Sequence, residues 1–318
     1  MKLGGFVIHG DNAVTIEPCL DSLAAVCDDL VAVDAGSSDG SEAAARARGF
    51  RVLRRSWEGY GAARAAAVAE LRGCDWILFL DSDEWFEPAS IEAIRRFKGA
   101  PPAAPRIEFT RNDWAELGGK RFLYRREHHV RLVRADHARW DRSMIVHEAL
   151  DPGPTASIAA AVEHRFLTDL DEMRAKVNRY ALLWALRYHR AGVRKKSPAL
   201  QRVAHLFREL VLKGSLFTGP REACSIARVI AGYHARKYEL LREVSAGRHA
   251  RLLALLEQDQ LGELFRSIET WTPGVAPVRP ALASPAGSGE ARLEPRPVPV
   301  APRRERGATP GRRAASPP

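Results

Sequence analysis

The most constraining feature of this sequence is residues 75–84, Asp-Trp-Ile-Leu-Phe-Leu-Asp-Ser-Asp-Glu, where five consecutive apolar residues end abruptly at acids. An apolar run of this length is typical of a strand buried on both faces of a sheet. Open α/β sheets bind their ligands at the carboxyl ends of such strands. Asp81 and Asp83 are two positions apart, so in extended backbone both carboxylates point to the same side. We therefore expect a ligand site where this strand ends.

The Asp-x-Asp pair suggests a divalent cation. Carboxylate oxygens are the ligands that Mg²⁺ and Mn²⁺ prefer, and these ions often complete their coordination with water and substrate phosphates. An alternative is a solvated acidic turn, in which Glu84 and Glu87 begin the next helix near its positive end. Since Asp-x-Asp is a short pattern, both interpretations stay open at this point.

Strand-like and helix-like segments alternate along the first 110 residues. The expected strands are residues 3–8, 30–33, 52–53, 76–80 and 106–110, and the expected helices are residues 14–26, 40–48, 61–71 and 89–98. This alternation favours βαβ units, and so an α/β fold with a mostly parallel sheet flanked by helices. After residue 110 the segments are shorter and more charged, which predicts short antiparallel strands at 121–124, 130–134 and 144–146.

Composition narrows the class of protein. A chain of 318 residues with 46% apolar residues can bury a sizeable core, and its net charge of +10 favours anionic partners. The four cysteines show no Cys-x-x-Cys spacing, as expected of reduced core residues in a cytosolic protein. The first ten residues do not resemble a signal peptide, and no apolar run is long enough for a membrane span. Nucleic-acid recognition motifs are absent, so nucleic acid is not an expected partner.

The second expected strand also ends in an acid. Asp34 follows Val33 and opens a glycine- and serine-rich turn, where its carboxylate can accept hydrogen bonds from a nucleobase imide or a ribose hydroxyl. Asp39, later in the turn, is either an N-cap of the next helix or a further ligand contact. The glycines form neither Gly-x-Gly-x-x-Gly nor a P-loop, which disfavours a dinucleotide-binding domain and an NTPase.

A loop with glycines around an aromatic residue, 57–61, follows the third expected strand. Such a loop can approach a ligand closely, and Arg64 enters the helix just after it. Its guanidinium could pair with a diphosphate through two hydrogen bonds, or it could form an ordinary surface salt bridge.

Four motifs occur in order along the chain. They are Ile-x-x-Cys-Leu-x-Ser-Leu (16–23), Val-Asp-Ala-Gly-Ser-Ser-Asp-Gly (33–40), Trp-x-Gly-Tyr-Gly-x-x-Arg (57–64) and Asp-Trp-Ile-Leu-x-Leu-Asp-x-Asp-Glu (75–84). Together they resemble the GT-A catalytic domain of family 2 glycosyltransferases, and most of all the lipopolysaccharide core β-glucosyltransferase branch. Later landmarks agree, namely Arg131-Leu132, Val146-His147-Glu148, His164 and Lys237-Tyr238. The likeness covers about residues 3–245.

This resemblance implies a metal-dependent, inverting hexosyltransferase. The donor would be a nucleoside diphosphate sugar such as a UDP-hexose, and the acceptor a glycan or a lipid-linked molecule such as lipopolysaccharide core. Inverting transfer needs one carboxylate to deprotonate the acceptor hydroxyl. The resemblance favours Glu148 for that role, with Glu127 and Asp113 as alternatives.

The same resemblance suggests two sets of ligand contacts. The nucleotide-sugar contacts would be Asp34, Asp39, Arg64, Asp81 and His147. The metal ligands would be Asp81, Asp83 and His164. Either histidine could instead be an ordinary hydrogen-bonded polar residue.

Residues 166–271 are predicted to form amphipathic helices, at 169–189, 198–217 and 220–241. Their apolar stripes could pack on the sheet or on each other. Because many arginines and lysines flank the stripes, they could also lie on an anionic membrane surface. A lipid-linked acceptor would place the protein in the cytoplasm, peripherally on the cytoplasmic face of the inner membrane.

The expected domains are therefore a catalytic domain at 1–165, a helical region at 166–271 and a tail at 272–318. Within the first, 1–110 would bind the nucleotide sugar and 111–165 the acceptor. The tail is rich in proline, alanine and arginine, so we expect it to be disordered.

Two other functions stay open at this point. A sugar-phosphate nucleotidyltransferase also builds a metal and nucleotide site on an α/β sheet, but the Gly10-Asp11-Asn12 turn is a poor phosphate-binding loop. The other is a non-catalytic protein that binds a membrane surface. This function would explain the basic helices but would leave the acids at the strand ends unexplained.

Overall fold

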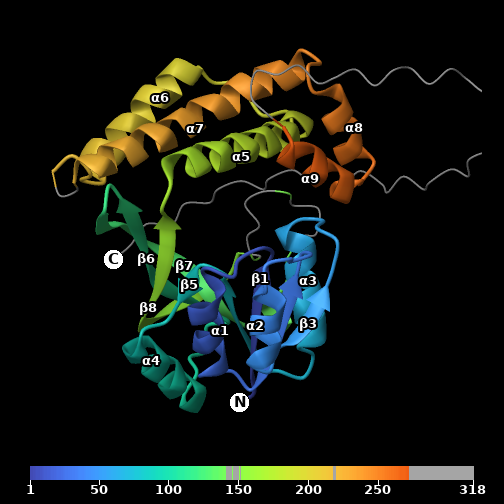
Figure 1. Ribbon diagram of the computed structural model, residues 1–318, viewed down its shortest axis with the longest axis vertical. Helices are drawn as coiled ribbons and strands as arrows, with labels where there is room; N and C mark the ends of the chain where they lie inside the picture. The colour runs from blue at the N-terminus through green and yellow to red at the C-terminus, as the bar shows by residue number, and fades with distance from the viewer. Residues whose placement is uncertain (141–144, 146–149, 151, 218–219, 272–318) are drawn as a thin grey trace, which may run out of the picture. The chain divides into compact units, whose positions relative to one another are not determined.

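The computed structural model describes residues 1–140, 145, 150, 152–217 and 220–271 (Figure 1). Residues 1–275 form one compact unit. The second unit, 276–318, and the whole predicted tail from residue 272 lie outside the described residues. The division of the first unit at residue 165 stays a prediction.

A mixed sheet forms the centre of the described structure, with strand order β3-β2-β1-β4-β7-β6-β8-β5. The strands are β1 (Leu3–His9), β2 (Asp29–Asp34), β3 (Arg51–Arg54), β4 (Trp76–Asp81), β5 (Glu84–Trp85), β6 (Arg106–Leu117), β7 (Lys120–Arg134) and β8 (Thr155–Leu167). Among these strands, four neighbouring pairs are parallel and three, β4–β7, β6–β7 and β5–β8, are antiparallel. The predicted α/β class with a mostly parallel sheet is confirmed.

Helices cover both faces of this sheet. They are α1 (Ile16–Ala24), α2 (Ser41–Ala47), α3 (Tyr60–Glu70) and α4 (Pro88–Gly99), each within two residues of the predicted bounds. Leu20 of α1 and Ile94 of α4 belong to a core that includes Leu78 and Leu80 of β4. Ala67 of α3 belongs to a second core, with Ile77 and Phe79 of the same strand. Since alternate residues of β4 enter different cores, the strand is buried on both faces, as its continuous apolar run predicts.

The segment after residue 110 differs from the prediction. Instead of short strands at 121–124 and 130–134, β7 is one strand of 15 residues that pairs antiparallel with the whole of β6. The many charges do not interrupt it, because arginines and carboxylates from the two strands pair with each other, as Arg125 does with Asp113. Of the predicted strand at 144–146, only Ile145 is described, and it lies in no strand.

The C-terminal part is helical, as predicted. It comprises α5 (Leu170–Arg190), α6 (Pro198–Phe207), a π-helical turn η2 (Arg208–Leu212), α7 (Arg221–Ser245), α8 (Ala250–Glu257) and α9 (Leu261–Glu269). The apolar stripe of α5 is buried, with Leu183 and Trp184 packed against α7, α8 and α9. Met173 joins a smaller core with strand residues Ala115 and Leu167. None of the helices in the described ranges combines the length and apolarity needed to cross a bilayer.

Candidate functional site

The two acid-ended strands finish at one edge of the sheet. In the register of the parallel strands, Asp34 of β2 lies beside His9 of β1, and Asp81 of β4 lies beside Ile8. Residues two apart in a strand point to the same face of the sheet. Asp34 therefore shares a face with Ala32, which lies in one core, and Asp81 shares the other face with Phe79, which lies in the second core. The predicted common edge is therefore present, but the two carboxylates do not share a face.

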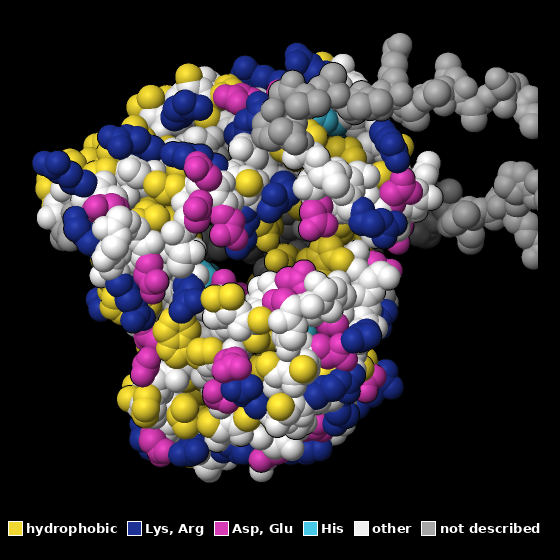
Figure 2. Space-filling view, in the orientation of Figure 1, with side chains coloured by type: hydrophobic (Ala, Val, Ile, Leu, Met, Phe, Trp, Pro, Cys, Tyr) yellow, Lys and Arg dark blue, Asp and Glu magenta, His cyan; other side chains and the backbone are white. Residues whose placement is uncertain are grey.

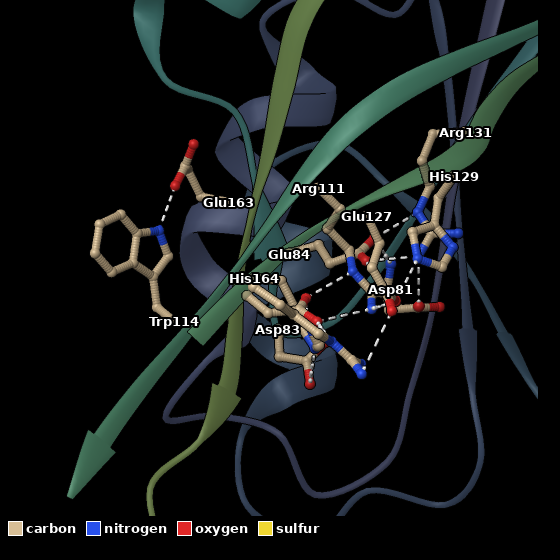
Figure 3. A network of polar contacts seen from close by, with 12 residues as sticks. Asp81, Asp83, Glu84, Arg111, Trp114, Glu127, His129, Arg131, Glu163 and His164 are labelled. Atoms are coloured by element: carbon tan, nitrogen blue, oxygen red, sulfur yellow. Dashed lines mark hydrogen bonds and ion pairs between the residues drawn. The ribbon is translucent and has the colours of Figure 1, made fainter. Parts of the chain in front are cut away.

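Asp81 belongs to a dense network of acids and arginines (Figure 3). Arg131 of β7 donates to Asp81 Oδ2 at 2.9 Å, and Arg64 Nη2 lies 3.4 Å from Asp81 Oδ1. Burial alone would raise the pKa of Asp81, but Arg131 and Arg64 outweigh it and lower the pKa well below its usual range. Asp81 is thus ionised and held by arginines.

Glu84 is the buried centre of this network. Its side chain is 0% exposed, and Arg131 grips it through Nε at 2.7 Å and Nη2 at 2.5 Å. Its Oε2 also accepts a hydrogen bond from the backbone N–H of Asp81, at 3.2 Å. Glu84 lies in β5 rather than at a helix start, so the alternative in which it merely begins the next helix does not hold for this residue.

Asp83 occupies the turn between β4 and β5, and its side chain is 30% exposed. One contact is described for its carboxylate, with His164 Nε2 at 3.5 Å. Asp83 also lines an open hollow of about 150 Å³, together with Val14, Trp85 and Arg165. The Asp81 side chain is more exposed, at 41%, but its two oxygens face Arg64 and Arg131, so Asp83 is the acid of the pair whose carboxylate is not held by an arginine among the described residues.

His164 of β8 lies between two carboxylates. Its Nδ1 contacts Asp113 Oδ1 at 2.7 Å, and its Nε2 faces Asp83. Burial would lower the pKa of His164, but the hydrogen bonds with Asp113 and Asp83 raise the pKa to about 9. The His164 imidazole is therefore positively charged at neutral pH, and it holds the Asp83 carboxylate in position.

The two alternative bases face this network differently. Asp113 is fully buried and also holds Arg111 and Arg125, so it does not reach an acceptor. Glu127 is 31% exposed, and its neighbours include His129 and Lys213. The hydrogen bond with His129, together with Arg125 and Lys213, lowers the pKa of Glu127 to about 2 despite partial burial. A carboxylate this acidic is a weak general base.

The end of β2 is tied internally. Asp34 is 0% exposed, and its Oδ1 accepts hydrogen bonds from the backbone and hydroxyl of Ser37. His9 Nδ1 lies 3.5 Å from that oxygen. Asp34 Oδ2 and His9 Nε2 are both buried without a hydrogen-bond partner among the described residues. Asp34 Oδ2 thus accepts no hydrogen bond among the described residues, although Arg54 Nε lies 3.9 Å from it.

Asp39 ties neighbouring loops together. Its Oδ1 accepts from the backbone and hydroxyl of Ser41, the first residue of α2, and its Oδ2 accepts from the Ala13 N–H at 2.7 Å. These hydrogen bonds lower the pKa of Asp39 to about 2. The N-cap residue of α2 is Gly40, so Asp39 is not the N-cap, although it accepts the first backbone N–H of the helix from one residue earlier. The proposed nucleotide-sugar contact stays a prediction.

The loop at 57–61, which was predicted to approach a ligand, packs instead against helix α9. Gly59 has φ +100°, and a Cβ there would lie 3.0 Å from the Phe265 ring of α9. Arg64 is 9% exposed and lies over the rings of Tyr60 and Phe79, so it is no surface salt bridge, and a diphosphate contact stays a prediction.

The predicted metal ligands fit a cation only in part. Within the described residues, no group of three or more His, Cys, Asp or Glu side chains is arranged to hold a metal ion. The oxygens of Asp81 face arginines, and both nitrogens of His164 face carboxylates. Among the three predicted ligands, Asp83 is the one that lines the open hollow. Glu148 and His147 lie outside the described residues.

Sequence reasoning missed the cations that organise the site. Arg111 and Arg131 pair with the buried Glu84, and Arg125 pairs with the buried Asp113. A signal was available for Arg131, since it interrupts the apolar run Val130-Arg-Leu-Val, and an arginine in a buried strand requires a carboxylate. Which carboxylate that would be depends on the sheet order.

Comparisons with known proteins place this site in a family. Residues 8–139 match the model described as Glycosyl transferase family 2. The lipopolysaccharide core biosynthesis glycosyltransferase LpsC of Rhizobium meliloti is 25% identical over 62% of this chain and 75% of its own length. An uncharacterized glycosyltransferase of Rickettsia bellii is 31% identical over 26% of this chain, and the match spans only 28% of that protein.

Similarity to solved structures is partial. The chain overlaps a crystal structure of glucosyl-3-phosphoglycerate synthase from Mycobacterium tuberculosis, in complex with Mn²⁺, UDP and phosphoglyceric acid, with a TM-score of 0.29 and 22% identity. The overlap covers 37% of this chain and 44% of that one. The likeness therefore rests on the sequence match, which runs from the last two residues of β1 through β7 and includes the acids at the ends of β2 and β4. Residues 8–139 of this chain are similar to glycosyl transferase family 2.

Proposed function

We propose that this protein is an inverting glycosyltransferase that uses a nucleoside diphosphate sugar, such as a UDP-hexose. One observation carries the proposal. In the region that matches family 2, the strands β2 and β4 lie on either side of β1, and both end in an aspartate at the same edge of the sheet. Ligands of α/β sheets bind at such edges. Beside them, Asp83 faces an open hollow.

The nucleoside would lie over the end of β2. Oδ2 of Asp34 accepts no hydrogen bond among the described residues and lies 3.9 Å from Arg54 Nε, so it could accept one from a donor such as a nucleobase imide N–H. Because Asp34 is fully buried, the loop through Ser37 must open for such a contact. The small hollow lined by Val33 and Trp57 does not include Asp34, and at about 10 Å³ it is too small for a nucleoside.

A bound Mg²⁺ or Mn²⁺ would be held by Asp83. When bound, the cation would neutralise charge on the leaving diphosphate. Mg²⁺ commonly takes one or two carboxylates plus substrate phosphates, so one exposed aspartate is a sufficient protein contact. His164 would orient Asp83, while Asp81 would stay with Arg131 and Arg64.

For the general base, we keep Glu148. Asp113 is buried among cations, and Glu127 has a strongly lowered pKa, so neither alternative suits proton abstraction at neutral pH. The base would take the proton of the acceptor hydroxyl as its oxygen attacks the anomeric carbon and the diphosphate leaves.

The acceptor would be a glycan or lipid-linked molecule, such as lipopolysaccharide core. The similarity to LpsC, named for lipopolysaccharide core biosynthesis, supports this choice. A lipid-linked acceptor would place the protein peripherally on the cytoplasmic face of the membrane.

A thermal-shift screen of nucleoside diphosphate sugars, with and without Mn²⁺, tests this function. We expect one sugar nucleotide to raise Tm, and Mn²⁺ to increase that shift. Release of the nucleoside diphosphate should then depend on acceptor. Stabilisation by nucleoside triphosphates with release of pyrophosphate would instead indicate a nucleotidyltransferase, and a protein that binds no nucleotide would contradict the proposal.

A further inference from the structure

Exposed large apolar side chains concentrate in one segment. Nine are exposed in the described residues, and seven of these lie within 200–217: Leu200, Val203, Phe207, Val211, Leu212, Leu216 and Phe217. Soluble monomers rarely expose a contiguous apolar patch without a binding role. We call residues 198–217, with α6 and η2, the α6–η2 segment.

The apolar side chains of α6 form one outward stripe. Leu200, Val203 and Phe207 recur at helical spacing and are 64%, 65% and 55% exposed. None of the residues of α6 is buried, so the helix is attached to the molecule only by its opposite face. On that face His205 stacks on His234 of α7, with ring centroids 3.4 Å apart.

The π-helical turn η2 continues the stripe while sending polar groups inward. Glu209 is 2% exposed and accepts a hydrogen bond from the Tyr124 hydroxyl at 3.2 Å. Lys213, just after the turn, lies 3.2 Å from Glu209 and 3.5 Å from Glu127. Leu212, which lies between Glu209 and Lys213 in the sequence, is 71% exposed. The segment is thus fixed to β7 and to the site while its apolar side chains face outward.

Charge around the stripe has one sign. From residue 194 to 217 the sequence contains six Lys or Arg and a single acid, Glu209, which is buried. Exposed cations near the stripe are Arg194, Lys195, Lys196, Arg202 and Arg208. Figure 2 shows hydrophobic and basic side chains interspersed over the helical part of the molecule. An apolar stripe bordered by exposed cations suits an anionic bilayer, where acyl chains take up the apolar groups and headgroups meet the cations.

We propose that the α6–η2 segment is the surface by which this protein docks on an anionic phospholipid bilayer. A second copy of the chain would bring its cations against the same cations, and nucleic acid offers no partner for the apolar stripe. The bilayer satisfies both features. The inference deepens the proposed function, because the link from Lys213 to Glu127 would hold the acceptor side of the site near the membrane, where a lipid-linked acceptor lies.

The test measures co-sedimentation of the full chain with lipid vesicles. Vesicles of phosphatidylcholine alone are compared with vesicles that also contain phosphatidylglycerol, at low and high salt. We expect binding to the anionic vesicles only, weakened by salt. The triple variant Leu200→Ser, Val203→Ser, Phe207→Ser should lower the partition coefficient by about tenfold or more.

Matched charge variants distinguish binding through the cations of the α6–η2 segment from attraction due to the net charge of the whole protein. Arg202→Glu with Arg208→Glu should weaken binding, whereas Arg46→Glu with Arg95→Glu should leave binding within about twofold of wild type. Arg46 and Arg95 are similarly exposed, at 56% and 53%, but lie on α2 and α4. The change of net charge is identical in the two pairs.

Three results would overturn the inference. The wild-type protein could fail to bind anionic vesicles, or the triple variant could bind them like wild type. The third is a wild-type oligomer that becomes monomeric in the triple variant while vesicle binding is unchanged. Nucleotide-induced thermal shifts of the triple variant report separately on the proposed function. We expect them to match wild type, so a failure of docking is distinguishable from a failure of the enzyme assignment.

Discussion

At the scale of single residues, the acids near the end of β4 have separate roles. Glu84 is fully buried and gripped by Arg131, so it supports the fold. Asp83, one residue earlier, is partly exposed and faces the hollow. The difference arises because β5 pairs with β8 at Glu84, which fixes that side chain beneath the sheet edge while the turn leaves Asp83 outside.

Glu84→Gln should lower the free energy of unfolding by about 3–5 kcal/mol, because it leaves Arg131 buried without its full counter-charge. Urea unfolding at pH 7 measures this. The control Glu92→Gln removes an exposed partner of Arg95 and should change stability by less than about 1 kcal/mol. Equal small changes in both variants would contradict the structural role of Glu84.

At the scale of elements, the helical region carries a half-buried pair of titratable residues, His205 and His234. Burial and the nearby charges of Lys237, His205, Arg208 and Lys213 lower the pKa of His234 to about 3. The ordinary pKa of histidine is about 6.5, so the unfolded chain binds this proton more readily than the folded one. Stability from this group is therefore complete above about pH 6.5 and is lost as pH falls below it.

His234→Phe keeps a ring to stack on His205 and removes this titration. Between pH 7.5 and pH 5, we expect the wild-type Tm to fall more than the Tm of the variant. His137→Phe serves as a control, since His137 is 45% exposed in η1 (Ala135–His137), and should keep the wild-type pH dependence. Parallel Tm curves for wild type and His234→Phe would refute this account.

The elements were largely predictable, because strands and helices depend on local apolar periodicity. The βα units up to residue 99 agree with their predicted bounds within a few residues. The hairpin β6–β7 was not predicted at its full length, since some of its charged residues are stabilised by the other strand, as Arg125 is by Asp113, and others by more distant elements, as Arg131 is by Glu84. Pairing across strands is a tertiary property that sequence order alone does not give.

The site was predictable only to the level of the acids at strand ends. Asp34, Asp81 and Asp83 were singled out, and their common edge follows from parallel strands. Which of them is free for a ligand depends on Arg64 and Arg131, which arrive from α3 and β7. The exposure of the α6 stripe and the burial of the α5 stripe were likewise not separable by periodicity, because both helices are amphipathic.

At the scale of the whole molecule, polar and apolar contacts join the sheet, whose sequence matches the family 2 model at residues 8–139, to the C-terminal helices. Tyr124 and Lys213 connect strand β7 to the turn η2, and Trp57 packs against Phe265 of α9. The helices therefore border both β7 and the loop after β3. A transferase that acts on a lipid-linked acceptor would need this combination of nucleotide site and membrane surface in one unit.

The central claim is that Asp83 is the acid that engages the donor. The most direct measurement is the initial rate of nucleoside diphosphate release from the sugar nucleotide, with Mn²⁺ and acceptor, for wild type and Asp83→Asn at equal concentrations of folded protein. We predict a loss of about a hundredfold or more, with an unchanged Tm, since the side chain is partly exposed and has only the long contact to His164. A variant that keeps the wild-type rate would contradict the account.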